Sequence, residues 1–371
     1  MTHSPSDSAY MAHALRLAER GRYTTMPNPQ VGCVLVRENQ IVAEGWHHRA
    51  GEPHAEANAL ARAGDRARGA TAYVTLEPCS HTGRTGPCSD ALIAAGVRRV
   101  VYGMEDPNIQ VAGRGLTKLR AAGVEVSGPL LEEEARALNP GFIKRMEHGQ
   151  PFVRCKLAMS LDGRTAMASG ESKWVTGRRA REDVQRLRAR SCAIISGIDT
   201  VLLDRAALTV RADELQLADA ESIASRQPLR VILDSRLRLP QDAPLLDHPG
   251  PILLVHAGAE EAGTWPAHVE TLALPGPNQR IDLQALLTEL ARRECNEVLV
   301  EAGAVLAGAF VARGLLDELI VYMAPKLLGS SARPLFDLPL EKMSGHLPLH
   351  IQDVRALGQD WRITARLDPE G

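Results

Sequence analysis

The sequence lacks the excess of positive charge and the aromatic content of a nucleic-acid-binding surface. Its 371 residues include 43 Lys and Arg against 45 Asp and Glu, a formal net charge of -2, and aromatic residues make up only 4%. Binding to a phosphate backbone needs a basic patch, and binding to single strands adds aromatic side chains on which bases stack. We therefore expect no nucleic acid partner.

Long apolar runs and a secretory leader are missing as well. The N-terminal segment MTHSPSDSAY is polar and has no apolar core of the kind that a signal peptide needs. No uninterrupted apolar run approaches the roughly 20 residues of a membrane-spanning helix. We expect no membrane association and a cytoplasmic location.

Cysteine is scarce, with six in the chain. Four of them, Cys33, Cys155, Cys192 and Cys295, stand singly in apolar, strand-like segments, where cysteine behaves as a small buried hydrophobic residue. A disulfide framework is therefore not expected, which fits a reducing cytoplasm.

The length of the chain favours two domains over a single hydrophobic core. In the first part, alternating helix-like and strand-like segments predict an α/β sandwich of about 140 residues. We predict helices at 8–22, 54–63, 88–95, 113–122 and 130–138, and strands at 31–36, 40–45, 72–76, 97–102 and 124–126. Asn-Pro-Gly at 139–141 is expected to break this pattern, and the polar segment 147–151 is the expected junction. The predicted domains are 1–147 and 148–371.

The second part shows the same alternation of strands and helices. We predict strands at 152–157, 193–197, 229–233, 252–255, 297–300 and 319–323, and helices at 178–190, 284–293 and 303–313. Residues 212–226 are polar and rich in alanine, and we expect them to form a surface excursion. The second domain is therefore also predicted to be α/β.

One group of residues in the first part points to chemistry. His54 and Glu56 lie in the first turn of a predicted helix, and Cys79 and Cys88 each follow a proline. One imidazole and two thiolates suit a tetrahedral zinc ion whose fourth position is left for water. His-x-Glu followed by Pro-Cys is the signature of zinc deaminases that act on nucleobases. We interpret His54, Cys79 and Cys88 as zinc ligands and Glu56 as the catalytic proton carrier.

Two plainer interpretations compete with this one. In the first, His54 and Glu56 are surface residues of a helix, and Cys79 and Cys88 have only a structural role. Against it, each cysteine follows a proline, and the order strand, loop, helix brings the ligands together. The second alternative is a closed structural zinc site. No fourth Cys or His has a suitable spacing for that, His81 being the nearest contender.

The spacing of the two cysteines departs from the general signature. That signature has two intervening residues, whereas Ser-His-Thr-Gly-Arg-Thr-Gly-Pro separates Cys79 from Cys88. The insert carries His81 and Arg84, polar groups that suit a phosphorylated substrate. Asn28 stands between two prolines, and it is either a turn residue or a hydrogen-bonding partner for a base or ribose.

These motifs resemble those of the bifunctional deaminase/reductase family of riboflavin biosynthesis. The resemblance rests on Pro-Asn-Pro at 27–29, His-Ala-Glu at 54–56 and the eleven residues from Pro78 to Cys88, and it extends over nearly the whole chain. The family usually has proline where Gly86 stands. The resemblance implies a cytidine deaminase-like three-layer α/β/α sandwich that holds one Zn²⁺, followed by a dihydrofolate reductase-like α/β domain that binds NADPH. It also implies that Asn28 and His81 contact the substrate.

Residue spacing alone says less about the second part. Val-Leu-Val-Glu-Ala-Gly at 298–303 runs from a strand into a helix start, where backbone N–H groups could bind a pyrophosphate. The Gly-x-Gly-x-x-Gly fingerprint is absent, so a Rossmann dinucleotide site is disfavoured. Arg236 and Arg238 suit an adenosine 2′-phosphate and a solvated loop equally well.

Lys-Leu-Ala-Met-Ser-Leu-Asp-Gly-Arg at 156–164 and Gly-Glu-Ser-Lys-Trp at 170–174 resemble the opening motifs of the family's reductase domain. By position, the resemblance implies NADPH contacts from Ala158, Trp174, Thr200, Asp204, Ser235, Gly303, Ala304, Val305, Leu306, Ala307, Gly308 and Ala309. It implies contacts with the sugar phosphate from Ser172, Arg188, Leu208, Arg211 and Glu301. Guanidinium groups suit phosphate, although Arg188 also fits a solvated helix face. Lys156, Asp204 and Glu301 are expected around the reacting ribose, with Lys156 and Asp204 as catalytic candidates.

The family resemblance, together with these features, implies a two-step enzyme of flavin synthesis. Zinc-dependent hydrolytic deamination of 2,5-diamino-6-ribosylamino-4(3H)-pyrimidinone 5′-phosphate would precede NADPH-dependent reduction of the ribosyl group to ribityl. The expected partner is a small phosphorylated pyrimidine, and the protein is expected to be a homo-oligomer. One alternative is a nucleic acid base deaminase with an appended binding domain, which the charge and the long insert disfavour. Another is a zinc-stabilised binding protein whose site has decayed, which the intact Glu56 disfavours.

Overall fold

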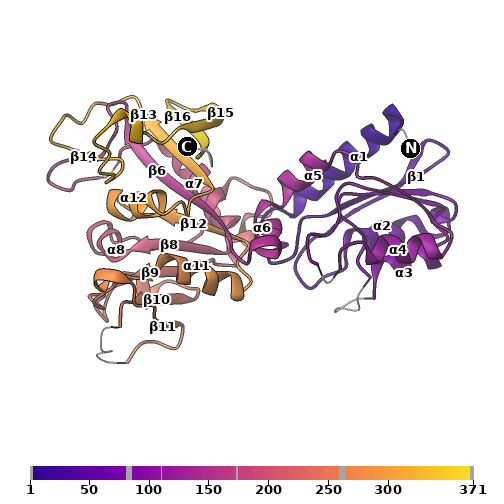
Figure 1. The fold of residues 1–371 in the computed structure, drawn as a ribbon, viewed down its shortest axis with the longest axis horizontal. Helices are drawn as coiled ribbons and strands as arrows, with labels where there is room; N and C mark the ends of the chain where they lie inside the picture. The colour runs from indigo at the N-terminus through magenta and orange to yellow at the C-terminus, as the bar shows by residue number, and fades with distance from the viewer. Residues whose placement is uncertain (1–2, 81–85, 110, 173, 259–263, 368–371) are drawn as a thin grey trace. The chain divides into compact units, whose positions relative to one another are not determined.

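The computed structural model describes residues 3–80, 86–109, 111–172, 174–258 and 264–367. It divides into two compact units, Met1–Gln150 and Pro151–Gly371 (Figure 1). The division follows Gln150, within the polar segment 147–151. In the described residues, no helix is both long enough and apolar enough to cross a membrane.

The first unit is built on a five-stranded mixed sheet in the order β2-β1-β3-β4-β5. Its strands are β1 Gly32–Arg37, β2 Gln40–Trp46, β3 Thr71–Val74, β4 Arg99–Tyr102 and β5 Glu125–Ser127. β1 pairs antiparallel with β2 and β3, whereas β3, β4 and β5 run parallel. The central strands are buried on both faces, as strands between two helical layers must be.

Helices cover both faces of this sheet (Figure 1). α2 Ala55–Ala63, α3 Cys88–Ala94 and α4 Arg114–Ala121 share one cluster with the sheet residues Cys33, Leu35 and Val100. α1 Pro5–Ala18, α5 Glu132–Leu138 and α6 Pro140–His148 share the other cluster with Val34, Tyr73 and Val101. Short 3-10 turns extend α1 and α2 at Glu19–Gly21 and Gly64–Ala67. The expected three-layer α/β/α sandwich is confirmed.

α6 is not predicted from the sequence. The Asn-Pro-Gly segment separates two helices and does not end the helical part of the unit, because α6 begins at Pro140 itself. Proline is well tolerated in the first turn of a helix, where its missing N–H has no intrahelical acceptor.

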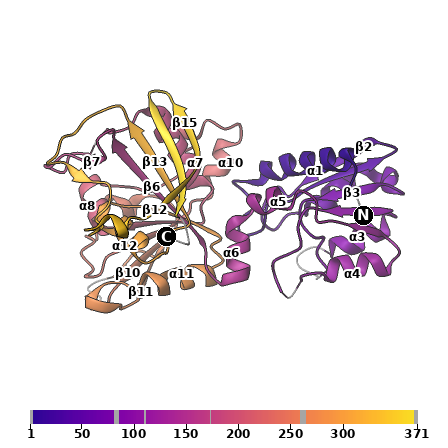
Figure 2. The ribbon, with the colours of Figure 1, turned by 45° about the horizontal axis from the view of Figure 1, so that its top comes forward.

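The second unit contains a nine-stranded sheet in the order β11-β10-β9-β8-β12-β6-β13-β16-β15 (Figure 2). The strands from β11 to β13 in this order run parallel, and β16 and β15 add an antiparallel hairpin at one edge. Their bounds are β6 Phe152–Ser160, β8 Ala193–Gly197, β9 Leu229–Leu233, β10 Ile252–His256, β11 Val269–Ala273, β12 Glu297–Glu301, β13 Glu318–Ala324, β15 Leu349–Leu357 and β16 Asp360–Leu367. A separate pair joins β7 Arg164–Ala166 to β14 Arg333–Pro334.

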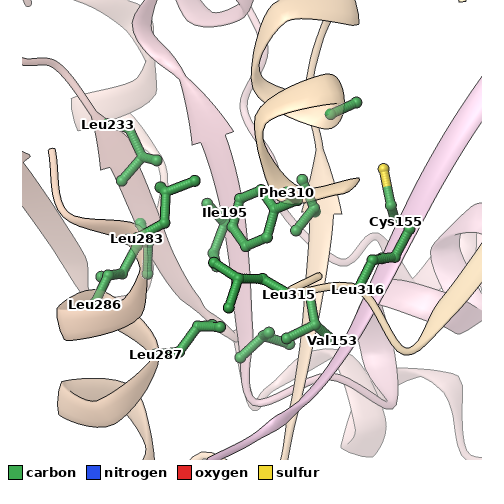
Figure 3. Packing of buried hydrophobic residues seen from close by; sticks show 14 of the residues in the cluster. Val153, Cys155, Ile195, Leu233, Leu283, Leu286, Leu287, Phe310, Leu315 and Leu316 are labelled. Atoms are coloured by element: carbon green, nitrogen blue, oxygen red, sulfur yellow. The ribbon is translucent and has the colours of Figure 1, made fainter. Parts of the chain in front are cut away.

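Helices also lie on both faces of the large sheet. α11 Leu283–Arg292 and α12 Ala304–Ala312 pack on one face, where Phe310 belongs to the same buried cluster as Ile195 and the leucines of α11 (Figure 3). α7 Arg178–Ala189 packs on Leu299, Ile320 and Tyr322 of the opposite face. The remaining helices are α8 Ile198–Asp204, α9 Ala212–Leu215 and α10 Ala220–Ala224, with 3-10 turns at Pro244–Asp247, Pro277–Gln279 and Met343–Gly345. The α/β class expected for this part is confirmed.

The C-terminal hairpin was not predicted from the sequence. β15 carries apolar and polar residues that are almost all exposed, so its alternation does not point to a buried face. α8, which follows β8 directly and has only seven residues, was not predicted. Residues 212–226 contain the two short helices α9 and α10.

Candidate active sites

The first candidate site lies where α2 and α3 begin and where the chain leaves β3. His54 is the N-cap of α2, with extended backbone (φ -70°, ψ 168°), and Cys88 is the first residue of α3. The imidazole Nδ1 of His54 lies 3.7 Å from the Cys79 Sγ and 3.4 Å from the Cys88 Sγ. The structure therefore brings all three predicted ligands together.

These distances fit a metal ion. The three ligand atoms all lie within 4.8 Å of one another. Zn–S and Zn–N bonds of about 2.3 and 2.0 Å at tetrahedral angles separate neighbouring ligand atoms by about 3.6 Å. The donor set, one imidazole and two thiols, is one that zinc prefers. With three protein ligands, one tetrahedral position stays open.

The local charges favour a thiolate at Cys79. A hydrogen bond from the Cys88 thiol lowers the pKa of Cys79 to about 4, and the Cys88 backbone N–H also donates to its sulfur at 3.3 Å. The same shared proton raises the pKa of Cys88, and the bond to Cys79 raises that of His54. A bound cation would replace this shared proton and favour both thiolates.

Glu56 lies beside this cluster in the first turn of α2. The residue is 3% exposed, and burial raises the pKa of its carboxyl to about 7, with the nearby Cys79 adding to the shift. A carboxyl with a pKa near neutrality can both accept and donate a proton at physiological pH. Its position beside the cluster and its raised pKa are compatible with the role of proton carrier.

Asn28 is fixed by a histidine that the sequence analysis did not single out. The Asn28 Nδ2 lies 3.1 Å from the His47 Nε2, and the His47 Nδ1 lies 3.1 Å from the Pro53 carbonyl oxygen. Because a carbonyl only accepts, Nδ1 of His47 donates and Nε2 accepts from the Asn28 amide. The buried His47 ring also meets the His54 ring edge-on at 5.4 Å. His47 follows the end of a hairpin strand, and no sequence signal links it to Asn28. His81 and Arg84 lie outside the described residues.

The second candidate site is a cavity of about 1320 Å³ in the second unit. It lies where β6, β8 and β12 end and where α8 and α12 begin, the usual position of ligands in open α/β sheets. The predicted residues that line it are Lys156, Ala158, Ser172, Trp174, Arg188, Thr200, Asp204, Leu208, Arg211, Ser235, Glu301, Gly303, Ala304, Val305, Leu306 and Ala309. Ala307 and Gly308 do not line it. Ala307 belongs to the hydrophobic core, and a Cβ on Gly308 would lie 2.3 Å from the Asp337 carbonyl oxygen.

Three charged groups meet inside the cavity. Arg188 donates to both carboxylate oxygens of Glu301, from Nε to Oε1 at 2.6 Å and from Nη2 to Oε2 at 2.9 Å. The Lys156 Nζ lies 3.9 Å from the Glu301 Oε2. Burial lowers the pKa of Lys156 although Glu301 opposes the shift. Burial would raise the pKa of Glu301, but Arg188 and then Lys156 keep it low. The group is therefore a carboxylate held by an arginine, beside a lysine that releases its proton more easily than usual.

The other predicted contacts surround this group. Ser172 donates to the Asp204 carboxylate at 2.8 Å, and Arg188 also donates to the Thr209 carbonyl oxygen. Arg211 pairs with Glu214 on the outer side. Arg188 and Arg211, the two arginines predicted to bind phosphate, therefore already bind carboxylates. A phosphate would have to share each arginine with its glutamate, Glu301 or Glu214, or displace that glutamate.

The cavity also contains residues that the sequence did not point to. The Arg181 guanidinium lies over the exposed Trp174 ring, 4.4 Å from the ring centroid, and makes a cation–π contact. Arg333 and the segment 278–280 come from elements far along the chain. Only the fold brings Arg181, Arg333 and the segment 278–280 to the same cavity.

Each of the two units matches the model of a known protein family. The model of the cytidine and deoxycytidylate deaminase zinc-binding region matches residues 4–104, and that of the RibD C-terminal domain matches residues 151–363. The riboflavin biosynthesis protein RibD of Escherichia coli K12 is 53% identical over 360 residues, covering 95% of this chain and 97% of that protein. The Haemophilus influenzae RibD is 49% identical, with 97% of each chain covered.

Solved structures agree over the same length. Acinetobacter baumannii RibD, form 1, superposes with a TM-score of 0.90 at 47% identity, covering 98% of this chain and 99% of that one. A diaminohydroxyphosphoribosylaminopyrimidine deaminase/5-amino-6-(5-phosphoribosylamino)uracil reductase from Thermotoga maritima gives a TM-score of 0.85 at 33% identity, with the same coverage.

Proposed function

Because this chain belongs to the RibD family of bifunctional deaminase/reductases of riboflavin biosynthesis, we propose that its two sites catalyse consecutive steps on one phosphorylated pyrimidine. The first unit is a deaminase domain of the zinc-binding kind, and the second is a reductase domain. We propose 2,5-diamino-6-ribosylamino-4(3H)-pyrimidinone 5′-phosphate as the first substrate. The deaminated product is then reduced at its ribosyl group.

In the deaminase, His54, Cys79 and Cys88 would hold the zinc ion. Zinc in such a site lowers the pKa of water at its open position towards neutrality. Glu56 takes a proton from the attacking water and delivers it to the departing ammonia, which its pKa of about 7 permits. Asn28 donates its amide N–H to His47, and we infer that its carbonyl oxygen accepts a hydrogen bond from the substrate. The observation that carries this assignment is the tetrahedral spacing of the three ligand atoms beside the buried Glu56.

In the reductase, we infer that NADPH binds near the N-terminus of α12, with Ala158, Trp174, Thr200 and Ser235 around it. The first turn of α12 presents backbone N–H groups without intrahelical acceptors, and a Cβ on Gly303 would meet nothing within 4 Å. The cavity exceeds the usual upper size of about 1,000 Å³ for a single ligand site, which suits a cofactor and a substrate together. Hydride chemistry belongs to NADPH, while Lys156, Asp204 and Glu301 would bind the ribose and move its protons.

A coupled assay with metal analysis tests the proposal. We expect about one zinc per chain, ammonia release from the diaminopyrimidine phosphate, and NADPH oxidation that depends on the deaminated product. Ammonia release without any NADPH oxidation would contradict the reductase assignment. Protein that contains no zinc and releases no ammonia would contradict the deaminase assignment.

We further infer a cytoplasmic enzyme that has no nucleic acid partner and acts as a homo-oligomer. The inference about partners is supported by the net charge of -2. The one about assembly is supported by β15, an edge strand on which Leu349, Ile351 and Val354 are 48%, 58% and 50% exposed. Edge strands with exposed apolar side chains usually pair or are covered.

The assembly can be tested by light scattering after size exclusion. We expect the wild type to have a multiple of the 40.1 kDa chain mass, and Ile351→Glu to lower the mass because a charge would enter an apolar contact. His350→Glu adds the same charge to the next residue of β15, whose side chain points to the other face, and should leave the mass unchanged. A monomeric wild type would contradict the inference.

A further inference from the structure

Glu77 is a buried carboxylate next to the metal-ligand loop, yet it does not face the ligands. The residue is 3% exposed and follows the end of β3. Its Oε2 accepts hydrogen bonds from the backbone N–H groups of Asp106, at 3.2 Å, and Gly113, at 2.9 Å. Its Oε1 accepts from Gly115, at 2.9 Å, and Leu116, at 3.4 Å. Four backbone donors therefore surround one side chain.

These donors belong to the start of α4 and to the segment that precedes it. Gly115 and Leu116 lie in the first turn of α4, where N–H groups lack intrahelical acceptors and the helix dipole favours negative charge. No ion pair with Lys, Arg or His is found for Glu77 in the described part of the chain. Within the described residues, backbone N–H donors therefore satisfy this buried carboxyl group, which ties Glu77 to the position of α4.

A second contact joins the same two segments. A Cβ on Gly115 would lie 1.9 Å from the Pro78 carbonyl oxygen and 3.2 Å from the Glu77 Oε1. α4 therefore lies directly against the peptide that leads into Cys79, at a distance that only glycine allows.

Cys79 is held from the other side by α3. The Ser89 N–H donates to the Cys79 carbonyl oxygen at 3.1 Å, and the Cys88 N–H donates to the Cys79 sulfur at 3.3 Å. The loop that carries Cys79 thus lies between the first turns of two helices. α3 binds Cys79 itself, and α4 binds the two residues before it.

We propose that Glu77 is a positioning residue for the zinc ligand Cys79. By binding the amides of residues 106 and 113–116, it fixes the Pro78–Cys79 peptide against α4 and sets where the Cys79 sulfur lies relative to His54 and Cys88. The inference rests on the proposed zinc site. Residues that orient metal ligands without touching the metal commonly change metal affinity 10- to 100-fold when they are replaced.

The test compares Glu77→Gln with Asp7→Asn. The glutamine keeps the shape of Glu77 but turns an NH₂ group towards two backbone donors. Asp7 is a second buried carboxylate of the same unit, which accepts from the Tyr73 hydroxyl at 2.6 Å and from Arg99 at 3.0 Å, in the layer of α1 on the opposite face of the sheet. Asp7→Asn therefore destabilises the unit without touching the ligand loop.

Zinc transfer from each purified full-length protein to a chromophoric chelator is measured, together with the visible spectrum after Co²⁺ substitution and the unfolding temperature. We expect Glu77→Gln to release zinc about tenfold faster than the wild type and to shift the Co²⁺ bands. Asp7→Asn should release zinc at the wild-type rate and keep the wild-type Co²⁺ bands, even if its unfolding temperature falls as far as that of Glu77→Gln.

Wild-type zinc release and Co²⁺ bands in Glu77→Gln would overturn the inference. If Glu77→Gln does not fold, Gly115→Ala carries the same test, because its methyl group must displace the Pro78 carbonyl; an unchanged release rate there overturns the inference equally. A wild-type protein that binds neither Zn²⁺ nor Co²⁺ would instead contradict the proposed metal site.

Discussion

Replacing Glu56 by glutamine is expected to lower the rate of ammonia release by about 10²–10⁴-fold, the usual contribution of a positioned general acid and base. The amide cannot take a proton from water or pass one to the leaving amine. The fold should tolerate the change, because the substitution is isosteric and a carboxyl with a pKa of about 7 is already partly neutral at physiological pH. The measurement is ammonia release from the diaminopyrimidine phosphate.

Two controls separate lost chemistry from lost structure. Glu52→Gln changes an exposed glutamate two residues before His54 and should retain full activity. Glu56→Gln itself should keep its zinc and still reduce the deaminated product with NADPH. Wild-type ammonia release by Glu56→Gln would refute the mechanism.

The second large effect is expected at Lys156. Lys156→Met keeps most of the length of the side chain and removes the ammonium group beside Glu301, and we expect it to lower reduction of the deaminated product by about 10²–10⁴-fold. Glu301 keeps its two bonds to Arg188, so its buried carboxylate is not left without a partner. The measurement is NADPH oxidation with the deaminated pyrimidine.

Ammonia release by the same Lys156→Met protein provides the internal control, because the deaminase residues lie in the other unit. Lys342→Met removes an exposed lysine outside the cavity and should change neither rate. Undiminished NADPH oxidation by Lys156→Met would show that Lys156 neither binds the ribose nor moves its protons.

The zinc site could be proposed from the sequence because its motifs are local. His54 and Glu56 are two residues apart, and each cysteine is marked by the proline before it, so the motif can be read without knowing how the chain folds. The reductase residues had no such pattern. Lys156 and Glu301 lie on β6 and β12, which are neighbours in the sheet although about two thirds of the second unit separates them in sequence. For these residues the family resemblance supplied what spacing did not.

Some elements were unpredictable for physical reasons. The exposed hairpin of β15 and β16 has no buried face to impose an alternating pattern. At Pro140 the same residue type that commonly ends one helix also begins another. The exposure of the hairpin depends on what covers it, and the helix at Pro140 depends on the residues that follow. Local composition does not indicate either.

By itself, the sequence determined the two α/β units and predicted three zinc ligands and a general acid and base, because periodic burial and short motifs involve neighbouring residues. Only the tertiary structure decided how those residues are held. It placed His47 against Asn28 and His54, occupied Arg188 with Glu301, and surrounded Glu77 with the amides of α4. Each of these contacts joins residues 7 to 113 positions apart, and only packing brings such residues into contact.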